Sequence, residues 1–109
     1  MGLRTYYLGL LRKGPTWTAE ESPELAALQA AHMEHVRQKV ESGAALASGP
    51  VDDGSDIRGV TIYRTATLAE AEAIAQADPG VRAGRFVVEL HPWFVPAGLL
   101  PDPQTPPRG

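Results

Sequence analysis

The segment from Ala31 to Pro50 constrains the fold most, because it combines a helix end, a turn, a strand and a strand stop. Upstream of Gly43, side chains recur at three- and four-residue intervals, the spacing of one helical face. That face consists of Leu25, Leu28, His32, Val36 and Val40. Gly43 suits the position after a helix end, and Gly49-Pro50 ends the short strand that follows. The segment therefore predicts a helix that packs on a sheet through a face containing a histidine.

The rest of the chain alternates between strand and helix patterns. Strands are predicted at 4–13, 44–51, 59–65 and 85–91, and helices at 23–42 and 67–77. Ser22 and Thr67 are the predicted N-caps, with Thr18 as an alternative start of the first helix. From Pro92 onward we expect a tail, whose proline-rich end should be extended or disordered.

This order of elements is β-α-β-β-α-β, the ferredoxin-like arrangement of the α+β class. It predicts a four-stranded antiparallel sheet with two helices on one face. The domain is expected at residues 1–95 and the proline-rich C-terminal tail at 96–109. The strands are apolar on both sides, so the second face also needs cover. A homodimer formed sheet to sheet, with a higher homo-oligomer as an extension of it, satisfies that need.

The composition excludes several classes of function. There is no cysteine, which excludes a disulfide framework, a thiolate metal site and a cysteine nucleophile. The formal net charge is −3 and basic residues do not cluster, so we expect no nucleic-acid partner. No apolar stretch is long enough for a membrane span or a signal peptide. We therefore expect a cytoplasmic protein that does not bind membranes.

His32 is the main candidate for chemistry. A histidine on an apolar helical face can be a core residue whose ring nitrogens both have partners. It can also be a general acid or base at the edge of a pocket, because it titrates near neutral pH. Asp78, which Pro79 keeps out of the α region, could hydrogen-bond to it or could simply form a turn. Asp52 and Asp53 are rival carboxylates, although a solvated loop is the simpler role for them.

Four further residues are candidates for substrate binding. Ser48, Gly49 and Pro50 could bring backbone and a hydroxyl close to a ligand, or could merely end a strand. Trp17 could line an aromatic-accepting pocket or could serve packing alone.

The other two histidines have weaker claims. His35 follows His32 by three residues, a spacing that suits metal ligands, but no third ligand is evident. We therefore predict no metal and no cofactor. His91 is expected at an interface or partly exposed.

These residues, taken in order, resemble the YCII-related (YciI-like) family over roughly residues 6–93. The resemblance is carried by His32 eleven residues before Gly43, Gly49-Pro50 six residues later, Asp78-Pro79, Gly84 and His91-Pro92-Trp93. It implies a ferredoxin-like fold in a dimeric α+β barrel and a His–Asp pair at His32 and Asp78. One branch of the family removes chloride from a chlorinated hydroquinone-type aromatic, which implies enzymatic activity.

Three functions remain open from the sequence. The first is a small cofactor-free enzyme of the lyase, dehydrochlorinase or isomerase type. It would use the His–Asp pair for acid–base chemistry on a small organic, aromatic or carbonyl-bearing molecule. The second is a non-catalytic ligand-binding or regulatory dimer that uses the same pocket. The third is a structural interaction domain.

Overall fold

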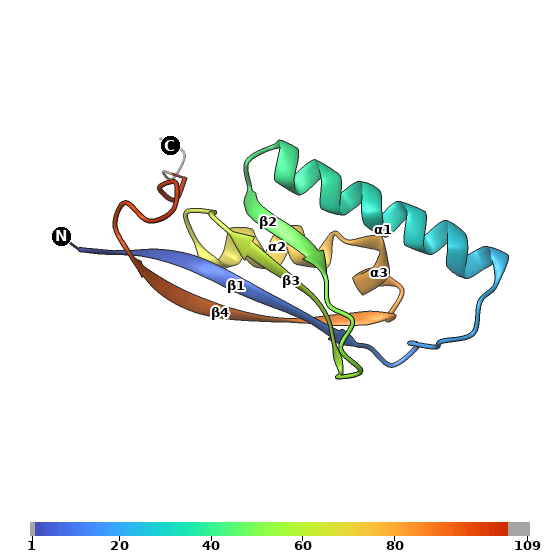
Figure 1. Cartoon of the computed structure of the whole chain (residues 1–109). Helices are drawn as coiled ribbons and strands as arrows, with labels where there is room; N and C mark the ends of the chain where they lie inside the picture. The colour runs from blue at the N-terminus through green and yellow to red at the C-terminus, as the bar shows by residue number, and fades with distance from the viewer. Residues whose placement is uncertain (1, 105–109) are drawn as a thin grey trace.

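The computed structural model describes residues 2–104. In chain order, its elements are β1 (Leu3–Lys13), α1 (Pro23–Glu41), β2 (Ala45–Pro50), β3 (Ile57–Tyr63), α2 (Leu68–Gln76), α3 (Pro79–Arg82) and β4 (Phe86–Pro96). The strands form one antiparallel sheet in the order β2-β3-β1-β4. The helices cover one face of this sheet (Figure 1). The predicted ferredoxin-like α+β fold is confirmed.

The two long helices begin at the predicted caps. The Ser22 hydroxyl accepts from the Leu25 backbone N–H at 3.0 Å, and Pro23 occupies the first turn. Thr67 accepts from the Glu70 N–H at 3.2 Å, and the Glu70 carboxylate accepts from the Ala66 N–H. The bonds to Ser22 and Thr67 satisfy N–H groups that the first helical turn leaves without partners, and the bond to Glu70 ties the residue before the cap to the helix. The alternative start of α1 at Thr18 is wrong.

Strand β4 is longer than the sequence predicts, and the expectation that a tail begins at Pro92 is wrong. The strand continues to Pro96 in unbroken register with β1, so that Leu3 pairs with Pro96. Because β4 is an edge strand, Pro92 and Pro96 can occupy it without removing N–H groups that the sheet needs.

The chain after β4 folds back on its own sheet up to Gln104. The Tyr6 hydroxyl donates to the Pro101 carbonyl at 2.7 Å, and the Gln104 N–H donates to the Arg64 carbonyl at 2.7 Å. Leu99 is nevertheless 71% exposed. This part of the expected tail is therefore docked on the domain, whereas residues 105–109 lie outside the described range.

The core on the helix side of the sheet lies under α2. Ala71 and Ala75 pack against Tyr63, and Tyr7, Ile74, Val88 and Leu90 surround them. Gly9 leaves room for the Tyr63 ring, since a Cβ at Gly9 would lie 2.9 Å from it. The region under α1 is less completely filled and contains the cavity described below.

The opposite sheet face carries apolar side chains at paired positions. Leu8 is opposite Ile62 and Leu10 is opposite Val60 in the β1–β3 register. All four residues are only half-buried. Among the described residues, no helix is both long and apolar enough to cross a membrane.

Candidate active site

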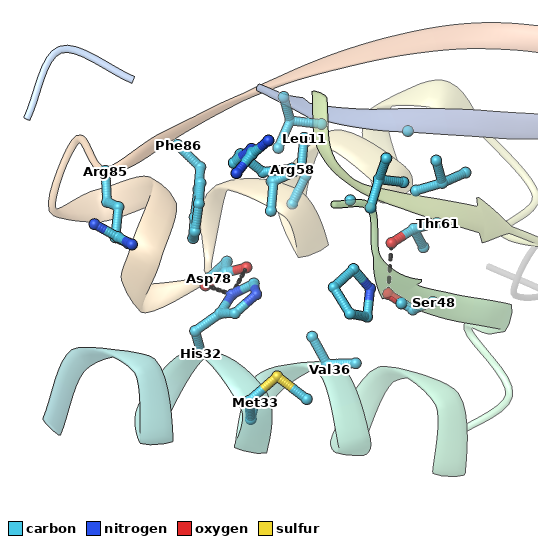
Figure 2. Close-up of a pocket in the computed structure, with 18 of the residues that line it drawn as sticks. Leu11, His32, Met33, Val36, Ser48, Arg58, Thr61, Asp78, Arg85 and Phe86 are labelled. Carbon is cyan, nitrogen blue, oxygen red and sulfur yellow. Dashed lines mark hydrogen bonds and ion pairs between the residues drawn. The ribbon is translucent and has the colours of Figure 1, made fainter. Parts of the chain in front are cut away.

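A cavity of about 300 Å³ lies between α1 and the sheet. Helix α1 contributes His32, Met33, Val36 and Lys39 to its wall, and the strands contribute Leu11, Ser48 and Thr61. Trp17 closes one side, together with Asp78, Arg85 and Phe86. Figure 2 shows a His32–Asp78 pair and a Ser48–Thr61 pair on opposite sides of this space, with Met33 and Val36 between them. The cavity therefore has two polar ends and an apolar middle.

His32 and Asp78 form the first polar pair. Nδ1 of His32 lies 2.7 Å from Oδ2 and 2.9 Å from Oδ1 of Asp78. The side chains are 12% and 3% exposed, respectively. Burial alone would raise the pKa of Asp78, but the hydrogen bond and charge of His32 and the Gly80 N–H hold it below its ordinary value. Asp78 is therefore a carboxylate at neutral pH and accepts the Nδ1–H of His32.

Local structure explains why Asp78 faces His32. Asp78 is extended, as Pro79 requires, and its Oδ1 accepts the Gly80 N–H at 2.8 Å, which caps α3. The turn-forming and histidine-binding roles considered for Asp78 are therefore both present. The short helix α3 is absent from the predicted elements, because a four-residue helix has too little periodicity to detect.

Phe86 supports the histidine from the strand side. Its ring centroid lies 5.1 Å from that of His32, with the planes tilted by 47°. Gly80 makes this packing possible, since a Cβ there would lie 2.8 Å from the Phe86 ring. Pro79, Gly80 and Phe86 thus fix the positions of the His32 and Asp78 side chains.

The rival carboxylates do not bond to His32. Asp53 is exposed and accepts the Ser55 N–H at 2.9 Å within its own loop. Asp52 is on the cavity wall, in the loop that follows β2.

Ser48, Gly49 and Pro50 all line the cavity. The Ser48 hydroxyl lies 2.7 Å from that of Thr61, directly across the β2–β3 register. An irregularity between Ala45 and Ala47 changes the side-chain alternation and so turns Ser48 toward the helices. A Cβ at Gly49 would meet no atom within 4 Å, so packing within the chain does not require glycine there.

Lys39 is a cavity residue that the sequence analysis missed. It is 8% exposed, and its ammonium donates to the Thr61 hydroxyl at 3.1 Å. Burial lowers the pKa of Lys39, although the charge of Asp78 opposes this. Its position seven residues after His32 places it on the same helical face, and this spacing was the available signal. Val40, which the sequence placed on that face, is 38% exposed, so this assignment is wrong.

Trp17 lies among cations at the cavity wall. Its ring centroid is 4.3 Å from Lys13 Nζ, 5.6 Å from Arg85 Cζ and 5.8 Å from Arg58 Cζ. Arg85 also donates to the Thr18 carbonyl at 2.9 Å, which ties the loop to β4. Burial and the nearby charge of Arg58 lower the pKa of Arg85. This wall is therefore electropositive.

The other two histidines do not take part in the His32–Asp78 bond. His91 is exposed near Glu89 on the sheet face opposite the helices, which we call the open sheet face. His35 is half-buried, and within the described chain its Nε2 has no hydrogen-bond partner. No group of three or more metal-ligating His, Cys, Asp or Glu side chains occurs within residues 2–104.

Comparison with known proteins supports the fold and identifies the family. A search of curated protein sequences gave no significant match. Among solved structures, the chain is similar to 5-chloro-2-hydroxyhydroquinone dehydrochlorinase from Burkholderia phenoliruptrix AC1100, solved in complex with 2,5-dihydroxybenzoquinone. The TM-score is 0.57 at 20% identity, and the match covers 81% of this chain and 92% of the other. The model of the YCII-related domain matches residues 6–94, so the chain belongs to the YCII-related family.

Proposed function

We propose that this protein is a small acid–base enzyme in which His32, oriented by Asp78, transfers a proton to or from a small organic molecule. The observation that carries the proposal is the buried His32–Asp78 hydrogen bond on the wall of a cavity of about 300 Å³. A cavity of that size, apolar in the middle and polar at both ends, suits a single-ring compound.

The chemistry follows from the arrangement of the ring. Asp78 accepts the Nδ1–H and so leaves the Nε2 lone pair free to act as a base. His32 would take a proton from the substrate, and the released electron pair would form a new double bond. In a lyase or dehydrochlorinase, the leaving group then departs with its bonding pair. In an isomerase, the imidazolium returns the proton to another atom.

The structural neighbour supports an oxygenated ring as the substrate class. That protein is a dehydrochlorinase bound to 2,5-dihydroxybenzoquinone, and it shares this fold. Trp17 and Phe86 are flat apolar surfaces on the cavity wall and favour a planar molecule. Ser48, Gly49 and Pro50 would contact the end of the molecule that is remote from His32.

The test combines a ligand search with one substitution. A thermal-shift screen of a metabolite library that includes hydroquinones and hydroxybenzoquinones should reveal stabilising compounds, and turnover is then measured on them. His32→Gln should keep fold and binding but reduce turnover about 10²- to 10⁴-fold, the usual contribution of general acid–base catalysis. Unchanged turnover would refute the proposal. Binding without turnover in the wild-type protein would instead favour a non-catalytic ligand-binding module.

We also propose that the functional unit is a homodimer formed through the sheet face opposite the helices. Leu8, Leu10, Val60 and Ile62 leave an apolar surface on that face, which a second copy would cover. Segment 97–104 docks on the sheet through the hydroxyl of Tyr6. It leaves the side chains of these four residues half-buried.

A further inference from the structure

Lys39 carries a charge in a place where most helices bury an apolar side chain. It is 8% exposed on the cavity wall, and no ion pair involves it in the described part of the chain. Its contacts there are the Thr61 hydroxyl at 3.1 Å and the face of the Tyr63 ring, with its centroid 5.4 Å away. An ammonium buried without a carboxylate costs stability, so packing alone does not account for a lysine here.

The hydrogen bonds of Lys39 leave donor capacity unused. An ammonium has three N–H donors and no acceptor, so Lys39 must donate to Thr61. No other acceptor for Nζ is found within residues 2–104, which leaves two N–H groups without a protein partner. The Thr61 hydroxyl is paired in turn with Ser48. This end of the cavity is thus rich in donors and positively charged.

The opposite end of the same cavity holds the proton acceptor. Lys39 follows His32 by two helical turns, about 10 Å along the axis. Figure 2 shows the Ser48–Thr61 pair, which Lys39 extends, across the cavity from His32 and Asp78. A planar molecule between the two ends would present one edge to a base and the other to a cation.

We propose that Lys39, with the Ser48–Thr61 hydroxyl pair, is the oxyanion-binding centre of the cavity, and that the ligand is an enol, a phenol or a related carbonyl compound. This inference rests on the proposed function in placing the ligand beside His32. When Nε2 of His32 takes a proton from a C–H group, or from an O–H group conjugated with a carbonyl across the ring, the electron pair moves through the conjugated bonds to the carbonyl oxygen at the far end of the molecule. That oxygen becomes the enolate or phenolate oxygen and is held by the ammonium of Lys39. No oxidant or reductant is required.

A coloured phenol tests this directly, because 4-nitrophenolate absorbs visible light and 4-nitrophenol does not. The probe's apparent pKa should fall when it binds to the wild-type protein, since Lys39 stabilises the anion. Lys39→Met should weaken phenolate binding about 10-fold or more, the scale of a lost charge-assisted hydrogen bond. Binding of the neutral analogue 4-nitroanisole should be the same in both proteins.

Matched variants separate this role from general electrostatics and from packing. Arg37→Met removes an equal charge from the exposed side of α1 and should leave phenolate binding unchanged. Ser48→Ala should weaken it by a smaller factor than Lys39→Met. His32→Gln should retain phenolate binding even if it loses turnover, so failure of the proposed reaction and failure of the oxyanion centre give different results.

The fold control is circular dichroism, and Lys39→Met should remain folded because it replaces a buried cation with an apolar chain of similar length. Two outcomes on the wild-type protein alone would overturn the inference, whatever the variants do. One is an unchanged pKa of bound 4-nitrophenol, and the other is no binding of the phenolate at millimolar concentration. Equal phenolate binding by wild type and a folded Lys39→Met protein would overturn it as well.

Discussion

Nδ1 of His32 lies 2.7 Å from Oδ2 of Asp78, although 46 positions separate the two residues in the chain. The contact joins the middle of α1 to the residue that caps α3. Because Asp78 also accepts the Gly80 N–H, its carboxylate cannot rotate without giving up the cap. The histidine is therefore held by a group that the backbone itself fixes.

This geometry predicts a single tautomer for neutral His32. Asp78 is ionised and can only accept, so the proton must reside on Nδ1 and the lone pair on Nε2. ¹⁵N-correlated NMR of the histidine rings should show the Nδ1–H form for His32. Asp78→Asn keeps a capping side chain but removes the charge, and it should populate the Nε2–H form as well. Asp53→Asn, in an exposed loop, is the matched control and should change nothing.

A second prediction concerns Gly80, which controls the packing behind the histidine. A Cβ at this residue would lie 2.8 Å from Cδ2 of Phe86. Phe86 is 5% exposed, and its ring packs against that of His32. Gly80→Ala should therefore destabilise the protein by about 1–3 kcal/mol, the usual cost of overpacking. Chemical denaturation measures this.

Gly49→Ala is the matched control for that substitution, since a Cβ there meets no atom within 4 Å. It should change stability much less than Gly80→Ala. Equal stability of the two variants would show that Phe86 can move without cost.

The sequence predicts much of the fold, because its signals are local. Ser22 and Thr67 cap helices as their side-chain chemistry suggests, and His32 and Asp78 lie where helical spacing and Pro79 place them. The end of β4 was harder to predict, since prolines usually stop strands. Only the edge position of β4 makes Pro92 and Pro96 acceptable.

Lys39 shows the limit of reasoning from local pattern. Lysine side chains are almost always exposed, so the seven-residue spacing between His32 and Lys39 is weak evidence that Lys39 is buried. Its burial depends on β3, which brings Thr61 to the ammonium, and on the β2 irregularity that adds Ser48. Such a site requires three elements to come together, and no single segment of sequence encodes it.

A third prediction concerns assembly. If a second copy covers the open sheet face, sedimentation at micromolar concentration should give twice the chain mass. Leu10→Lys, opposite Val60 on that face, should yield monomers, because an unpaired buried charge costs on the order of several kcal/mol. Val40→Lys, on the exposed side of α1, should remain dimeric. A wild-type monomer across the concentration range would contradict the dimer.

The last prediction concerns the effect of His35 on how stability changes with pH. Burial lowers the pKa of His35 below its ordinary value of 6.5; the charges of Lys39 and His32 lower it further, and that of Asp78 partly opposes them. The unfolded chain therefore binds this proton at a higher pH than the folded chain does. Acidification from pH 7 to pH 5 should then reduce the free energy of unfolding.

His35→Gln removes this titration and should lose less stability over the same interval, as measured by urea unfolding at several pH values. His91→Gln, which changes an exposed histidine on the open sheet face, serves as the control and should behave as the wild type. If His35→Gln and wild type lost equal stability on acidification, the half-buried His35 ring would have to accept its proton without cost. That result would contradict the lowered pKa that burial and the charge of Lys39 give to His35.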